Sequence, residues 1–297
     1  MLQIGLRAHD FGKLPPRQMA DVLAEYHPDS IQLALAKALS VPALKGSSLE
    51  SGPGSLSPGY ARRIRGIFEA RGISIAVLGC YINPIHPDPL EREKSLCLFE
   101  EHLRHARDFG CALVGTETGS INADCTFHPD TEKEKTFDEF CKSAERLIYY
   151  AEKCGAAVAI EPVAHHHTVS TIEKTVKLLE RFPSPSLRII WDPVNLLPLT
   201  GLPGSIGSAA NQEAFFKECL DAFGDKIAAV HAKDFRMENG QKTGDLPAGT
   251  GEFDWPGFLK LLIERKPGID MLLENTGPVL ANSVISFIKE TIRKNLI

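Results

Sequence analysis

Four residues that can bind a metal stand at the ends of four apolar segments in the second half of the chain. The segments are AAVAIE (156–161), LRIIWD (187–192), IAAVHA (227–232) and IDMLLE (269–274), and they bring Glu161, Asp192, His231 and Glu274. Three carboxylates gathered in a dry site would repel one another strongly, and a divalent cation would remove that repulsion. The oxygen-rich set favours Mn²⁺, Mg²⁺ or Co²⁺, although Zn²⁺ also accepts carboxylate and imidazole ligands.

An alternative is that the four residues are unrelated. Each carboxylate could be buried beside an Arg or Lys partner, and the histidine could be an ordinary core residue. Four such residues in succession, all at the same end of an apolar segment, favour one shared site.

The elements that must position these residues alternate along the whole chain. Short apolar runs predict strands, and longer amphipathic segments predict helices between them. The expected strands are 2–6, 30–35, 73–79, 112–117, 156–161, 187–192, 227–232 and 269–274, and the expected helices lie near 16–26, 58–71, 89–109, 135–154, 171–182, 211–223, 256–266 and 279–294. Such alternation implies parallel strands, and eight units suit a closed (β/α)₈ TIM barrel formed as a single domain over 1–297.

The connections indicate which end of the barrel carries the function. Links from helix to strand are short, whereas links from strand to helix are long and polar, as in 118–134, 193–210 and 233–255. In α/β barrels the strand-to-helix loops build the functional face, at the C-terminal ends of the strands. The Gly/Ser/Pro-rich piece 46–59 is expected to be a mobile loop at that mouth, of the kind that serves as a lid.

Composition narrows the class of protein. The 297 residues contain 33 Lys and Arg against 38 Asp and Glu, a net charge of -5 that argues against a nucleic-acid-binding protein. No signal peptide and no membrane-spanning stretch is visible in the sequence. Seven scattered cysteines without a CxxC pair are typical of reduced thiols. We therefore expect a cytoplasmic globular protein.

Several motifs resemble those of the xylose-isomerase-like TIM-barrel superfamily, in its sugar phosphate isomerase/epimerase branch. They are GCYINPIHP (79–87), GTETGS (115–120), IEPV (160–163), WDPVN (191–195), VHAKDF (230–235), PAGTGEFDW (247–255) and LLENTGP (272–278). The most specific feature is the order Glu, Asp, His, Glu on strands five to eight, followed by Gly-x-Gly-Glu-x-x-Trp.

The resemblance implies a metal-dependent sugar isomerase or epimerase. In that family the four strand-end residues hold one divalent cation, which assigns Glu161, Asp192, His231 and Glu274 as ligands, with Mn²⁺ as the expected metal. Glu161 and Glu274 would also be the catalytic pair, one removing a proton beside the carbonyl and the other returning it. A metal-stabilised enediolate serves both epimerisation and aldose–ketose isomerisation, so the sequence leaves the two open.

Further residues near the mouth are candidates for substrate binding. They are Glu117, His167, Asn195, Lys233 and Arg236. His167 stands six positions after Glu161, and Asn195 stands at a position where many sugar epimerases have a histidine. A run of three histidines could equally be a solvated loop, and exposed loop cations are common. The expected partner is a small sugar or sugar derivative, with neither nucleic acid nor membrane, and homo-oligomerisation stays open.

Three other functions remain to be weighed. An inosose-dehydratase-like lyase would use the same metal and expel a hydroxyl group beside the enediolate. An AP-endonuclease-like repair enzyme would need three metals and additional histidines, and Asn195 occupies one of those positions. The last of these alternatives is a protein without catalytic activity. No phosphate-binding P-loop or dinucleotide fingerprint is present, so no NAD is implied.

Overall fold

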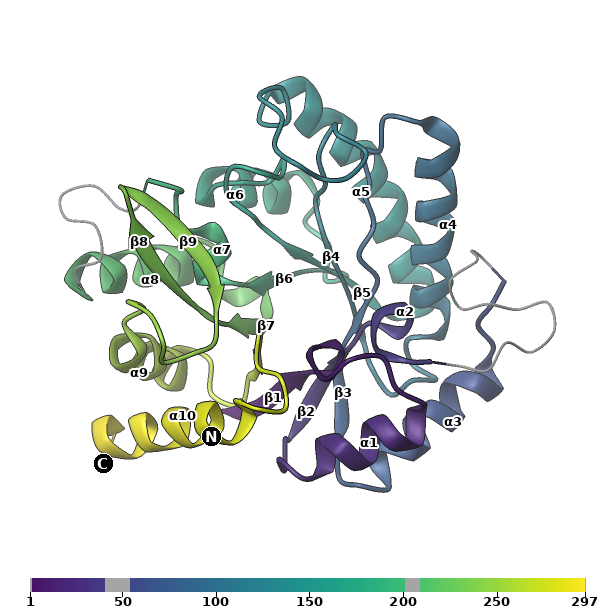
Figure 1. Ribbon diagram of the computed structural model, residues 1–297. Coiled ribbons are helices and arrows are strands. Elements are labelled where there is room, and N and C mark those ends of the chain that lie inside the picture. Colours follow the sequence, from purple (N-terminus) through teal and green to yellow (C-terminus); the bar gives the residue numbers. More distant parts are fainter. Residues whose placement is uncertain (1, 41–53, 201–208, 297) are drawn as a thin grey trace.

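The computed structural model describes residues 2–40, 54–200 and 209–296. Eight parallel strands form a closed barrel in the order β1-β10-β7-β6-β5-β4-β3-β2, with helices around it (Figure 1). The barrel strands are β1 (Gln3–Arg7), β2 (Ser30–Leu33), β3 (Ser74–Gly79), β4 (Leu113–Glu117), β5 (Ala157–Glu161), β6 (Leu187–Trp191), β7 (Ile227–Ala232) and β10 (Asp270–Leu273). The (β/α)₈ barrel predicted from the sequence is therefore confirmed.

The surrounding helices lie where the amphipathic segments predict them. They are α1 (Pro16–Ala24), α3 (Pro58–Glu69), α4 (Pro89–His105), α5 (Glu134–Cys154), α6 (Ile172–Arg181), α8 (Ala209–Phe223), α9 (Trp255–Arg265) and α10 (Ala281–Leu296). Ser57 caps α3, Thr171 caps α6 and Asp254 caps α9 by accepting a backbone N–H of the first turn. Among the described residues no helix has the length and apolar character of a membrane span.

Loop helices add detail at both ends of the strands. The mouth carries η1 (Ala8–Phe11), α2 (Leu35–Ala38) and α7 (Pro193–Leu196), while η2 (Gly224–Lys226) precedes β7. The loop expected at 46–59 falls outside the described residues over 46–53, and α3 begins within its last part.

A small apolar layer fills the inside of the barrel. It consists of Val77, Ala159, Ile190, Ala229 and Leu272, separate from the larger core between strands and helices. Space in this layer is tight: a Cβ atom on Gly115 would lie 2.7 Å from Ile190 Cδ1, and one on Gly5 would lie 2.6 Å from Leu272 Cδ2. The strands are thus apolar on both faces, and this layer forms the floor beneath the mouth.

Two residues beyond this layer, the side chains at the strand ends become polar. Because alternate residues of a strand share a face, Glu161 follows Ala159 inward, and Asp192, His231 and Glu274 follow Ile190, Ala229 and Leu272 in the same way. Arg7, Gln32 and Glu117 hold the corresponding positions after Gly5, Ser30 and Gly115. Seven of the eight strands therefore carry a polar residue at the mouth.

The long segment after β7 contains an antiparallel hairpin that the sequence analysis treated as loop. Strands β8 (Asp234–Glu238) and β9 (Gln241–Leu246) are joined by Asn239 and Gly240, both with positive φ. The hairpin lies beside α7 (Figure 1). Lys242 fastens it there, since its side chain donates to the backbone oxygens of Val194 and Leu197.

A buried carboxylate organises the rest of that segment. Asp234 is fully buried and accepts four N–H groups, from Phe235 N (2.9 Å), Gly249 N (3.0 Å), Phe253 N (3.0 Å) and Trp255 Nε1 (2.9 Å). A Cβ atom on Gly251 would lie 2.2 Å from the backbone oxygen of Phe235. The Gly-x-Gly-Glu-x-x-Trp piece therefore wraps closely around one side chain.

Candidate active site

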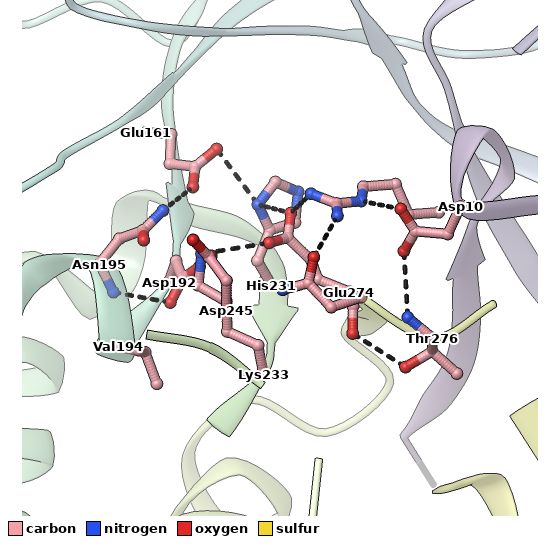
Figure 2. A network of polar contacts seen from close by, with 12 residues as sticks. Asp10, Glu161, Asp192, Val194, Asn195, His231, Lys233, Asp245, Glu274 and Thr276 are labelled. Atoms are coloured by element: carbon pink, nitrogen blue, oxygen red, sulfur yellow. Dashed lines mark hydrogen bonds and ion pairs between the residues drawn. The ribbon is translucent and has the colours of Figure 1, made fainter. Parts of the chain in front are cut away.

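The four strand-end residues meet at the mouth of the barrel (Figure 2). Their strands β5, β6, β7 and β10 are consecutive around the barrel. All four are almost completely buried, with exposures of 2% for Glu161, 1% for Asp192, 0% for His231 and 3% for Glu274. Figure 2 shows Glu161 and Glu274 on opposite sides of His231.

Three of the four already have the spacing of a metal site. Glu161, Asp192 and His231 each offer a ligand atom within 4.8 Å of the other two. His231 Nδ1 lies 3.1 Å from Glu161 Oε2 and equally 3.1 Å from Glu274 Oε1. The other ring nitrogen, Nε2, is hydrogen-bonded to Gln32 Oε1. This contact leaves the Nδ1 side of the imidazole facing the carboxylates.

Glu274 stands outside that triplet because cations hold its carboxylate. Arg7 Nη1 lies 2.9 Å from Glu274 Oε1, and Lys233 Nζ lies 3.3 Å from Glu274 Oε2. The guanidinium of Arg7 is itself fixed by Asp10 and Asn275. Glu274 therefore has the basic partners that the sequence analysis considered as the alternative to a shared metal site.

Lys233 is the central positive charge of the cluster. It is buried, and its ammonium lies 3.2 Å from Asp192 Oδ2 and 2.8 Å from Asp245 Oδ1. Asp245 reaches it from the end of the hairpin, with a positive φ of 65°. In this structure Lys233, predicted to bind substrate, neutralises the carboxylates.

Burial and crowding change the protonation of the site. Burial raises the pKa of Asp192 to about 6, although Lys233 opposes this effect. Burial disfavours the imidazolium form of His231, but Glu161 and Glu274 outweigh it and raise the pKa to about 9. Burial would also raise the pKa of Glu274, yet Lys233, His231 and Arg7 hold it well below its usual value. The metal-free cluster is thus held together by charge pairing among its own residues.

Two of the four residues, Glu161 and Glu274, line a cavity of about 340 Å³. Of the residues predicted to bind substrate, four line this cavity: Glu117, His167, Asn195 and Lys233. Arg236 does not: it lies exposed on β8, where it donates to Thr250 O at 2.6 Å. A larger hollow of about 620 Å³, bordered by Leu199 and Phe215, contains none of the four clustered residues.

Asn195 and His167 differ in what they contact. Asn195 Nδ2 donates to Glu161 Oε1 at 2.7 Å. The backbone N–H of Asn195 donates to Asp192 Oδ1 at 2.9 Å. His167 is buried, with Nε2 at 3.6 Å from Glu117 Oε2, and its Nδ1 has no hydrogen-bond partner among the residues that the structure describes. Burial lowers the pKa of His167 to about 4 and raises that of Glu117 to about 7, the latter with help from Glu161.

Several residues of the site were not predicted, and four of them matter for its geometry. Arg7, Gln32, Tyr81 and Asp245 all contact the cluster or line its cavity. Arg7 and Gln32 stand at strand ends, the same signal that identified Glu161. Tyr81 lies within the quoted segment 79–87, but nothing in that segment singled it out.

The residues present fit a divalent cation. Asp192 Oδ2 and His231 Nδ1 are buried, and within the described residues their close polar contacts are ion pairs, with Lys233 for the first atom and with Glu161 and Glu274 for the second. Two carboxylates and one imidazole are a suitable donor set for Mn²⁺, Mg²⁺, Co²⁺ or Zn²⁺. The contact of His231 Nε2 with Gln32 is the kind of outer-shell bond that orients a metal-binding histidine.

Comparison with known proteins agrees with this geometry. The family model described as xylose isomerase-like TIM barrel matches residues 32–291. A search of curated proteins found no match.

Solved structures share the fold at low sequence identity. A D-tagatose 3-epimerase-like protein superposes with a TM-score of 0.72 at 15% identity, over 99% of this chain and 98% of its own. A xylose isomerase-like TIM barrel protein from Mycobacterium smegmatis, solved with magnesium, gives 0.70 at 14% identity, over 100% and 98%. The 3-keto-D-glucoside 4-epimerase from E. coli, in its apo form, gives 0.68 at 15% identity, over 98% and 100%.

Proposed function

Because this chain belongs to the xylose isomerase-like TIM barrel family, we propose that it is a divalent-metal-dependent sugar isomerase or epimerase. The observation that carries the proposal is the buried cluster of Glu161, Asp192 and His231 beside Glu274, in which the first three residues offer ligand atoms within 4.8 Å of one another. The structural similarity to a D-tagatose 3-epimerase-like protein and to a 3-keto-D-glucoside 4-epimerase supports the substrate class. The proposed substrate is a small sugar that carries a carbonyl group.

The four strand-end residues are proposed to hold the cation, with Mn²⁺ as the first choice. When bound, it would polarise the carbonyl and adjacent hydroxyl oxygens of a sugar and make the neighbouring C–H more acidic. The relative solved with magnesium supports a divalent cation without deciding between metals. Glu274 would need to exchange part of its pairing with Arg7 and Lys233 for the cation.

Glu161 and Glu274 are proposed to exchange the proton. They stand on β5 and β10, with β6 and β7 between them, so a carbon above His231 would have one carboxylate on each face. Asn195 holds one oxygen of Glu161, and Arg7 holds one oxygen of Glu274, which fixes both carboxylates in position. A carboxylate on each face permits inversion at that carbon.

Dehydration is the second candidate function, and the pair of Glu117 and His167 favours it. Glu117 has a pKa of about 7, so at neutral pH a substantial fraction of it is a carboxylic acid that can protonate a departing hydroxyl group. His167 faces the same carboxyl group at 3.6 Å. Epimerisation leaves the substrate formula unchanged, whereas dehydration removes one water.

The first experiment measures metal content by mass spectrometry on protein purified without an affinity tag. Wild type should carry about one divalent ion per chain, before or after incubation with Mn²⁺, and Glu274→Gln should carry less. Glu180→Gln, at an exposed position of α6, is the matched control and should behave as wild type. Loaded protein is then incubated with ketoses and inososes in D₂O. Deuterium in an isomeric product supports isomerisation, and loss of water supports the lyase. Absence of ion binding in every condition would refute the proposal.

A further inference from the structure

Tyr81 occupies the one place at the mouth where a strand supplies no polar side chain. The residue of β3 that corresponds to Glu161 is Gly79, two positions beyond Val77. A Cβ atom on Gly79 would lie 3.0 Å from Tyr81 Cε2. Glycine at this position therefore leaves room for the ring of Tyr81, which lines the cavity in place of a β3 side chain.

Gln32 determines which way the hydroxyl group of Tyr81 can donate. If His231 Nδ1 is a metal ligand, its lone pair must be free, so the hydrogen of the neutral ring is on Nε2. That hydrogen is donated to Gln32 Oε1, which leaves the amide nitrogen of Gln32 to donate to Tyr81 Oη at 2.6 Å. Within the described part of the chain the hydroxyl hydrogen of Tyr81 meets no acceptor, so it is available to the cavity.

The surroundings keep this hydroxyl group a donor. Burial, reinforced by Glu161 and Glu274, raises the pKa of Tyr81 well above its usual value, so the phenol stays protonated. Lys37 Nζ lies 4.8 Å from the centre of the ring, over its face. The register of β2 and β3 shifts between Ile31 and Gln32, and irregularities of this kind often adjust a side chain beside a functional site.

We propose that Tyr81 donates a hydrogen bond to a hydroxyl or carbonyl oxygen of the bound sugar, and that Gln32 is the residue that positions it. This inference rests on the proposed sugar chemistry of the same cavity. It adds a substrate contact on the β2–β3 side of the mouth, away from His167 and Asn195. Gln32 thus links the orientation of a metal ligand to that of a substrate-binding group.

Tyr81→Phe is the first test. On Mn²⁺-loaded protein we expect the kcat/KM for the best ketose to fall by about tenfold or more, with metal content unchanged. Binding of an unreactive hexitol, measured by calorimetry, should weaken by a similar factor. Tyr60→Phe is the matched control, because it removes a buried tyrosine hydroxyl group that has no hydrogen-bond partner among the described residues and that belongs to α3, outside the lining of this cavity.

Gln32→Glu separates a directed hydrogen bond from a merely structural role. The new carboxylate still accepts from His231 Nε2, but it would accept the hydroxyl hydrogen of Tyr81 instead of donating to that oxygen. We expect the same loss of hexitol affinity as in Tyr81→Phe, retained metal, and no additional loss in the double variant. Independent, additive losses would overturn the positioning role of Gln32.

The outcomes also distinguish this inference from the proposed function. If wild type converts a ketose and Tyr81→Phe matches it in kcat/KM and hexitol affinity, only the role of Tyr81 is refuted. If metal-loaded wild type neither binds a hexitol nor converts any ketose, the sugar chemistry fails and the inference fails with it.

Discussion

Replacement of Asp234 by asparagine tests how the segment after β7 is held. Each carboxylate oxygen of Asp234 accepts two N–H groups, and all four contacts are between 2.9 and 3.0 Å. An asparagine amide keeps one oxygen and turns its NH₂ group toward two donors. Two hydrogen bonds to a charged acceptor are then lost, at about 1.5–3 kcal/mol each. We expect Asp234→Asn to lower the free energy of unfolding by about 3–6 kcal/mol.

The assay is urea denaturation followed by tryptophan fluorescence, since Trp255 Nε1 is one of the four donors. Asp225→Asn, at an exposed position of η2, controls for the loss of one negative charge and should change stability by less than about 0.5 kcal/mol. A loss below about 1 kcal/mol for Asp234→Asn would refute the reasoning, because the carboxylate would then not be what holds the segment.

Three further outcomes follow from the site and its supports. Burial holds the pKa of Asp192 at about 6 instead of 3.8, so the stability of chelator-treated protein should fall as pH rises from about 4 to 6. Asp192→Asn should therefore weaken the fall in stability of that protein between about pH 4 and 6, followed by urea denaturation; an unchanged pH dependence would contradict this. Gly251→Ala would press a methyl group against Phe235 O and should lower the free energy of unfolding by about 3 kcal/mol, again by urea denaturation, and an unchanged midpoint would count against the close packing. Asn195→Leu removes the hydrogen bond to Glu161 and should weaken Mn²⁺ binding about 10- to 100-fold in calorimetry; wild-type affinity would show that the bond does not orient the ligand.

The barrel could be predicted because its strands are unambiguous. A strand packed on both faces appears as a continuous apolar run. The predicted end of each strand lies within two residues of the observed end. The period of two then places Glu161 and Glu274 inward above Ala159 and Leu272. The fold and the inward direction of these side chains therefore follow from local patterns.

The hairpin escaped prediction because β9 is polar and largely exposed, without the alternation that reveals a strand. One signal was present, since Asn239 and Gly240 form the dipeptide that favours a two-residue hairpin turn. Asp245 could not be placed without the hairpin that carries it to Lys233.

The partners of Arg7 and Gln32 were out of reach for a different reason. Both residues stand at strand ends, so the rule that found Glu161 would have brought them to the mouth. Their contacts with Glu274 and His231, however, join residues more than 190 positions apart. Which strand ends face one another depends on closure of the barrel, which periodicity does not encode.

The tight layer under the mouth has a consequence for altering substrate scope. Gly5 and Gly115 cannot gain even a methyl group without displacing Leu272 or Ile190, and this layer carries every residue of the cluster directly above it. Directed evolution toward larger sugars should therefore accept substitutions in the walls, at positions such as Val163, His166 and Cys125. Libraries aimed at the floor should yield mostly misfolded protein, so the room available for new substrates lies in the loops.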